Sequence, residues 1–188
     1  MNSRLLILDL DETLIFGTEE KLHRAEDFRV GPYFVYKRPG LDRFIDFALM
    51  HFGVAVWTAS SADYADESVR RTFGDAGRLK FVWSRERCTR KRHPELSESY
   101  WVKDLKKVRR LGYSLEHVVV VDDTSRKLER SYGNHVCIIP FEGDPADTEL
   151  ARLESYLFLL KDVPNIRAVD MRSWRTARIA VGTSPSRK

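Results

Sequence analysis

Short runs of consecutive apolar residues alternate along this chain with segments in which apolar residues recur every three or four positions. The runs are typical of strands buried on both faces of a parallel sheet, and they lie at 5–10, 54–57, 118–121 and 136–139. The periodic segments predict helices at 41–48, 62–73, 104–111, 125–132 and 147–160. Because strands and helices alternate, we expect an α/β fold with a doubly wound parallel sheet and helices on both faces.

Two further segments complete the predicted organisation. Residues 28–38 resemble a small hairpin, with Gly31 and Pro32 in its turn. The length of 188 residues suits one domain, which we place at 1–174. The polar end of the chain at 175–188 predicts a flexible tail.

The composition argues against several classes of protein. No run of about 18 apolar residues exists, and the N-terminus lacks the longer apolar stretch of a secretory signal. We therefore expect a protein of the cytoplasm or nucleus that is neither secreted nor membrane-spanning. Two cysteines, Cys88 and Cys137, are too few for a disulfide scaffold or a zinc site, so we expect reduced thiols.

Positive charge is concentrated in one segment. The chain has a formal net charge of +4, yet residues 80–93 alone contain six Lys/Arg and a single Glu. Such a segment attracts phosphate on a nucleic acid, on a phosphoprotein or on a small anion. A solvated surface that binds nothing explains the same charge run equally well.

Polar side chains follow three of the predicted strands. They are Asp9, Asp11 and Thr13 where the run 5–10 ends, Thr58 and Ser60 after 54–57, and Asp122, Asp123 and Thr124 after 118–121. A single lysine, Lys103, precedes the helix before the third of these strands. Ligands of parallel sheets bind outside the carboxyl ends of the strands, so we expect these side chains to share one edge.

Carboxylates gathered in this way need a cation, because each would otherwise raise the pKa of its neighbours. A set of oxygen ligands suits Mg²⁺, and Lys103 adds a further positive charge that would attract a phosphoryl group. An aspartate beside the metal, Asp9, can attack phosphorus, and Asp11 two residues later can act as general acid and base. Four hydroxyl residues are explained equally well by capping or turn formation: Thr58, Ser60, Thr124 and Ser125.

Six segments together resemble a known family, the FCP/SCP-type phosphatases of the haloacid dehalogenase (HAD) superfamily, also called the NLI-interacting-factor family. They are DLDETLI (9–15), KRPGLDRFID (37–46), WTASSADYAD (57–66), YWVKDL (100–105), VVVVDDT (118–124) and IPFEGDPADTEL (139–150). The resemblance covers roughly residues 4–172. It implies a HAD-type Rossmann-like core, a small β-insertion at about 78–100 and no large cap domain.

The resemblance also implies the roles of the acidic residues and the lysine. Asp9 would be the nucleophile and a metal ligand, and Asp11 the general acid/base with its backbone carbonyl on Mg²⁺. Asp123 matches the family's metal ligand, while Asp122 would support the metal or Lys103. Lys103 would orient Asp9 and hold the phosphate.

The remaining roles concern the substrate. Thr58 would bind the phosphate, with Ser60 beside it, and Thr13 would steady the first loop. Tyr64 matches an aromatic residue of the substrate groove, and Arg85 matches an arginine that contacts phosphoprotein substrates.

Three departures from the family pattern concern the substrate rather than the chemistry. Asp123 stands where many members have Asn, Phe16 stands where a His is common, and residues 88–99 follow no family pattern. An uncapped site favours phosphoserine or phosphothreonine on a protein over a free metabolite. The basic segment leaves two alternatives: a nucleotide or nucleic-acid-end phosphatase, and a catalytically silent phosphate-binding module.

Overall fold

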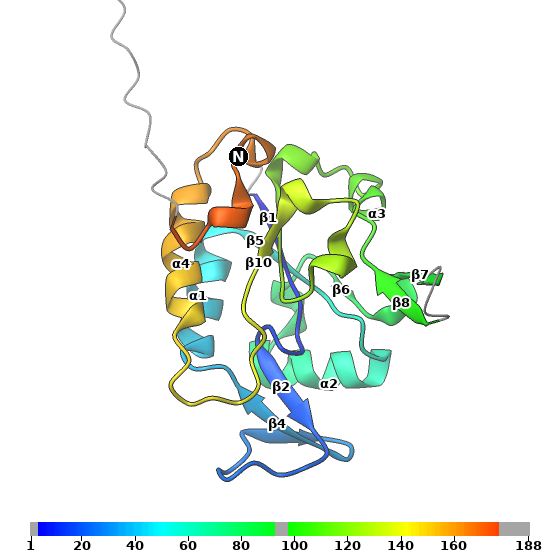
Figure 1. The fold of residues 1–188 in the computed structure, drawn as a ribbon, viewed down its shortest axis with the longest axis vertical. Helices are drawn as coiled ribbons and strands as arrows, with labels where there is room; N and C mark the ends of the chain where they lie inside the picture. The colour runs from blue at the N-terminus through cyan, green and yellow to red at the C-terminus, as the bar shows by residue number, and fades with distance from the viewer. Residues whose placement is uncertain (1–3, 93–97, 177–188) are drawn as a thin grey trace, which may run out of the picture.

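A computed structural model describes residues 4–92 and 98–176 of the chain. Its centre is a parallel sheet of five strands in the order β10-β9-β1-β5-β6 (Figure 1). These strands are β1 (Leu5–Leu8), β5 (Gly53–Trp57), β6 (Val82–Trp83), β9 (Val118–Asp122) and β10 (His135–Cys137). The predicted parallel α/β sheet is therefore confirmed, with β6 as a strand that the apolar runs did not predict.

The central position of β1 in the sheet explains why its sequence is apolar at every residue. Leu6 and Leu8 face a cluster formed with the helices α1, α2 and α4, whereas Leu5 and Ile7 face a second cluster with the short helix α3. Both faces of the sheet are thus covered, as predicted. The bounds are Leu41–His51 for α1, Ala62–Phe73 for α2, Lys106–Arg109 for α3 and Glu149–Leu160 for α4.

Helices α1 and α4 lie side by side on one side of the sheet, opposite α3 (Figure 1). In the part of the chain that the structure describes, no helix combines the length and the apolar character that crossing a bilayer requires.

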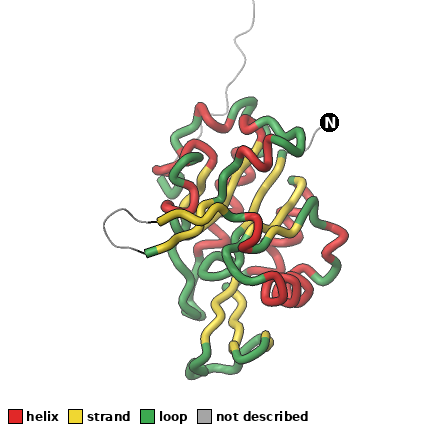
Figure 2. The backbone as a smooth tube through the Cα atoms, turned by 90° about the vertical axis from the view of Figure 1, so that its right-hand side faces the viewer, coloured by secondary structure: helices red, strands yellow, loops and turns green. Residues whose placement is uncertain are grey.

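Two small antiparallel sheets project from the parallel one (Figure 2). The first joins β2 (Ile15–Thr18), β4 (Tyr33–Lys37) and β3 (Phe28–Val30) below the carboxyl ends of the parallel strands. The strands β3 and β4 form the predicted hairpin, whereas β2 was not predicted from the sequence. The second is a hairpin of β7 (Thr89–Arg92) and β8 (Ser99–Val102).

The basic segment spans these elements rather than forming one of them. Residues 82–83 pair with β5 in the main sheet, and residues 89–92 form the first strand of the β7–β8 hairpin. Arg90 and Arg92 are exposed on that strand, and Lys91 pairs with Glu129. The last residue of the segment, at 93, and most of the tail predicted at 175–188 lie outside the described residues.

The helix predicted at 125–132 is wrong. The chain instead forms two 3₁₀ turns, Ser125–Leu128 and Tyr132–Asn134. The first turn buries a single apolar side chain, that of Leu128, which gives a longer helix no apolar stripe to pack against the sheet. The helix predicted at 104–111 is shorter in the structure than predicted, since only α3, Lys106–Arg109, is regular α-helix.

Candidate active site

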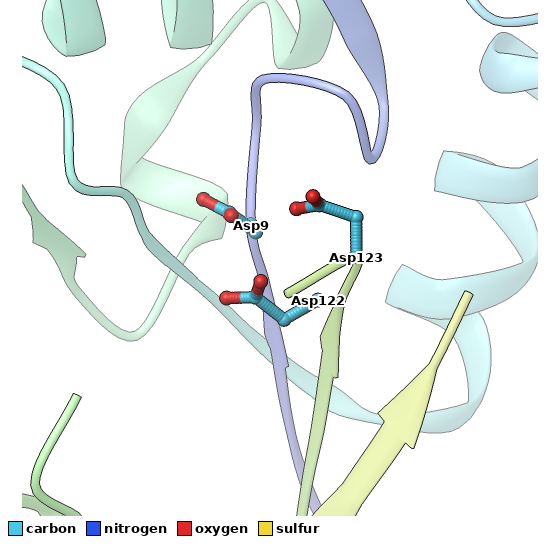
Figure 3. Close-up of side chains that lie close together, drawn as sticks. All are labelled: Asp9, Asp122 and Asp123. Carbon is cyan, nitrogen blue, oxygen red and sulfur yellow. The ribbon is translucent and has the colours of Figure 1, made fainter. Parts of the chain in front are cut away.

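Three aspartates meet at the carboxyl ends of two neighbouring strands. Asp9 follows β1, and its backbone N–H donates to Val121 of β9 at 3.0 Å. Asp122 ends β9 and Asp123 follows it, so that carboxylate oxygens of all three lie within 4.8 Å of one another (Figure 3). The sequence predicted this meeting, because parallel strands in register end at the same edge.

Two lysines balance the three carboxylates. The fully buried ammonium of Lys103 lies 3.0 Å from Asp9 Oδ1 and 2.5 Å from Asp122 Oδ2. Lys127 Nζ lies 2.7 Å from Asp9 Oδ2 and 3.3 Å from Asp123 Oδ1. Lys103 is among the residues predicted from the sequence, whereas Lys127, in the segment 125–132 predicted as a helix, is not.

Burial and charge act in opposite directions on these acids. Burial by itself would raise the pKa of Asp9, but Lys103 and Lys127 outweigh it and hold that pKa well below its usual range. Burial, followed by the charge of Asp9, raises the pKa of Asp122 to about 7. Asp9 is thus kept ionised, as a nucleophile at phosphorus must be.

Asp11 is not a member of this group, and its carboxylate is held by two hydroxyls. Ser60 Oγ donates to its Oδ2 at 2.5 Å, and Tyr64 OH donates to its Oδ1 at 2.7 Å. Burial raises the pKa of Asp11 above its ordinary value, although both hydrogen bonds work against the rise. A carboxyl with a raised pKa, exposed to a cavity, is suited to exchanging protons.

A cavity of about 240 Å³ opens onto Asp11. Its lining includes four residues that the sequence assigned to the site together with Phe16, the residue that departs from the family pattern. The full set is Asp11, Glu12, Phe16, Gly17, Tyr33, Ser60, Ser61, Tyr64 and Arg85. The exposed Arg85 is fixed at the rim by its Nε, which donates to the carbonyl of Ala59 at 2.7 Å.

The other six predicted residues lie outside this lining: Asp9, Lys103, Asp122 and Asp123, described above, and the two threonines Thr13 and Thr58. Thr58 is buried at the end of β5, where its Oγ1 accepts from the N–H of Ser60 at 3.1 Å. Thr13 is fully buried, and its hydroxyl has no hydrogen-bond partner among the described residues. The burial of Thr13 therefore argues against direct contact with a substrate. It is compatible with the predicted role of Thr13 in the first loop.

That loop is held by a buried arginine from the KRPG segment. Arg38 donates to the carbonyl of Thr13 at 3.1 Å, and its Nε and Nη2 contact the two oxygens of Asp147 at 2.9 and 2.8 Å. Within the loop, Glu12 takes the left-handed conformation, with φ of 59°. Segments 109 residues apart thus meet to fix the loop that presents Asp9 and Asp11.

The sequence of this chain matches a family of known proteins. The family model described as "NLI interacting factor-like phosphatase" matches residues 4–167. The chain belongs to this family. The resemblance to FCP/SCP-type phosphatases of the HAD superfamily and the prediction of a phosphatase are confirmed.

Individual relatives of this phosphatase agree with that assignment. CTD nuclear envelope phosphatase 1 of Xenopus tropicalis is 27% identical over 94% of this chain and 75% of the relative. A probable C-terminal domain small phosphatase of Dictyostelium discoideum is 30% identical over 88% of this chain and 53% of the relative. The structure of Fcp1, described as an essential RNA polymerase II CTD phosphatase, shares the fold with a TM-score of 0.56 at 19% identity, over 93% of this chain and 61% of that one.

The acidic group of this phosphatase has the composition of a metal site. Its donors, Asp9, Asp122 and Asp123, are all carboxylates, and Asp9 and Asp122 are almost completely buried. Buried carboxylates at this spacing repel one another, and hard oxygen donors without sulfur or nitrogen favour Mg²⁺ over zinc. A metal site at this edge of the sheet therefore fits the residues present.

Proposed function

We propose that this chain is a Mg²⁺-dependent phosphatase that removes phosphate from phosphoserine or phosphothreonine in a protein, through a phosphorylated Asp9. The observation that carries the proposal is the environment of Asp9. Its buried carboxylate touches two lysines and is kept ionised, and it lies two residues from a second acid with a raised pKa.

The chemistry needs two carboxyl groups with different tasks. An oxygen of Asp9 forms a bond to phosphorus as the bond to the serine or threonine oxygen breaks. Asp11 gives its proton to that leaving oxygen and later takes one from the water that hydrolyses the phosphorylated Asp9. The hydroxyls of Ser60 and Tyr64 keep Asp11 beside the cavity during both steps.

The positive groups at the site bind the phosphate and stabilise its charge. Mg²⁺ would be held by the carboxylates of Asp9 and Asp123, and by the backbone carbonyl of Asp11 as the family resemblance implies, and when bound it would supply positive charge to the phosphoryl group. Lys103 sits beside Asp9 on the buried side, where it orients the nucleophile. Thr58, whose Oγ1 accepts from the N–H of Ser60, is assigned to the phosphate by the family resemblance alone.

The cavity supports a protein substrate. It is lined by the aromatic side chains of Phe16, Tyr33 and Tyr64, with Arg85 at its rim, and nothing in the described residues covers it as a cap domain would. Aromatic walls fit the residues that flank a phosphorylated side chain, and an arginine fits its phosphate. The names of the relatives, CTD phosphatases, refer to a protein substrate of the same kind.

The place of action is part of this proposal. We expect the protein to work in the cytoplasm or the nucleus, and the relative from Xenopus tropicalis is named after the nuclear envelope.

Rates on two classes of substrate test the proposed function. In Mg²⁺, the protein should hydrolyse a phosphoserine peptide with a higher kcat/KM than a 3′-phosphorylated oligonucleotide of similar charge. Chelation by EDTA should remove the activity, and Mg²⁺ added in excess should restore it, because the carboxylates lose the cation that binds phosphate. A preference for the oligonucleotide would make this a nucleic-acid-end phosphatase, and activity that survives full metal removal would contradict the magnesium site.

A further inference from the structure

Lys127 contacts the acidic group, but it lies in none of the sequence motifs and takes no step in the proposed reaction. It lies in the 3₁₀ turn Ser125–Leu128, directly after β9. Its ammonium contacts Asp9 Oδ2 at 2.7 Å, Asp123 Oδ1 at 3.3 Å and Asp122 Oδ1 at 3.4 Å. A single side chain thus touches every member of the acidic group.

The two lysines reach the group from different surroundings. The side chain of Lys103 is completely buried, whereas that of Lys127 is 21% exposed. The backbone carbonyl of Lys127 accepts from the N–H of Lys103 at 2.7 Å, so the main chain at Lys127 is fixed. Beyond this anchor, the four-carbon side chain of Lys127 has a path to solvent, which Lys103 lacks.

The contacts of Lys127 involve the oxygens that a metal needs. Mg²⁺ binds carboxylate oxygens at about 2.0–2.1 Å and tolerates little distortion. An ammonium that already bonds Asp9 and Asp123 occupies the space between them, and its positive charge repels a divalent ion. Metal binding to these residues therefore requires the ammonium of Lys127 to leave.

We propose that Lys127 is a built-in competitor of Mg²⁺: it holds the acidic group together when no metal is bound, and it sets the Mg²⁺ concentration at which the enzyme becomes loaded. This inference rests on the proposed magnesium site. The three carboxylates then have a counter-charge both without and with metal: Lys127 supplies it in the metal-free protein, and Mg²⁺ supplies it in the loaded protein. The stability of the metal-free fold and the affinity for Mg²⁺ are coupled through this one side chain.

Calorimetric titration with Mg²⁺ tests the competition directly. Lys127→Met keeps most of the side-chain volume and removes the charge, so its Kd for Mg²⁺ should fall by about tenfold or more. In EDTA this variant should unfold at a lower temperature than the wild type, because the acids lose a counter-ion. Saturating Mg²⁺ should raise its Tm by more than it raises that of the wild type.

Three further variants make the result specific. Lys127→Gln should behave like Lys127→Met and serves as a second neutral variant if the latter does not fold, whereas Lys127→Arg keeps the charge and should keep the wild-type Kd. Lys80→Met removes an exposed lysine whose backbone N–H pairs with Val54, near the amino end of β5 and away from the acidic group. It should change neither the Kd for Mg²⁺ nor the Tm. If the wild type and the neutral variants bind Mg²⁺ with the same Kd, the competition is overturned while the magnesium site stands. If none of them binds Mg²⁺, the proposed site fails as well.

Discussion

Replacing Asp9 with asparagine should lower kcat on a phosphoserine peptide by roughly 10⁴-fold or more, the scale of loss seen when a catalytic nucleophile is removed. The amide has nearly the shape of the carboxylate but no charge with which to attack phosphorus. The measurement is steady-state hydrolysis in saturating Mg²⁺. Asp46→Asn, which changes an exposed aspartate of α1, is the matched control and should keep the wild-type rate.

The Asp9→Asn variant should also remain folded, which separates loss of chemistry from loss of structure. Lys103 retains its contact with Asp122 at 2.5 Å. Burial still raises the pKa of Asp122, but the further rise caused by the charge of Asp9 disappears. A circular dichroism spectrum and a cooperative thermal transition like those of the wild type would show this. Retained activity in a folded variant would exclude Asp9 as the nucleophile.

Replacing Lys103 with methionine should cost both activity and stability. The variant leaves two buried carboxylates, Asp9 and Asp122, without the ammonium that lies between them. Removing one partner of a buried ion pair typically costs about 3–5 kcal/mol of unfolding free energy. The loss of one positive group at the phosphate should lower kcat by about 10²–10³-fold. Urea unfolding and steady-state rates measure the two effects.

The pH dependence of that destabilisation identifies its cause. Asp122 already has a raised pKa in the folded protein, and loss of Lys103 raises it further. A group whose pKa is raised by folding contributes stability that is lost as the pH rises, so the penalty should grow from about pH 6 to about pH 9. Lys106→Met, an exposed lysine three residues later, should show no such penalty. A penalty independent of pH would contradict the ion-pair explanation.

The parallel sheet could be predicted because strands covered on both faces must be apolar at every position. The run at 5–10 and the run at 118–121 therefore indicated β1 and β9, and with them the meeting of Asp9 with Asp122 and Asp123. This part of the site follows from the order of the chain and the register of a parallel sheet.

Other parts depend on tertiary contacts that leave no periodic pattern. The strand β6 has two residues, and the turn Ser125–Leu128 is irregular because only Leu128 is buried in it. The wrong helix at 125–132 also concerns the site, because Lys127 lies in this segment and was not among the predicted site residues. Only the 3₁₀ turn brings its ammonium to Asp9, and no local signal in the sequence indicates that contact.

Identification of the phosphorylated residue tests the central claim most directly. The protein is mixed with a phosphopeptide in Mg²⁺, quenched in acid during turnover, digested and mapped by mass spectrometry. We predict one added phosphoryl group on the peptide that contains Asp9, and none in the Asp9→Asn variant treated in the same way. A phosphoryl group on any other residue, or turnover without an adduct under conditions where phosphorylation outpaces hydrolysis, would contradict the account.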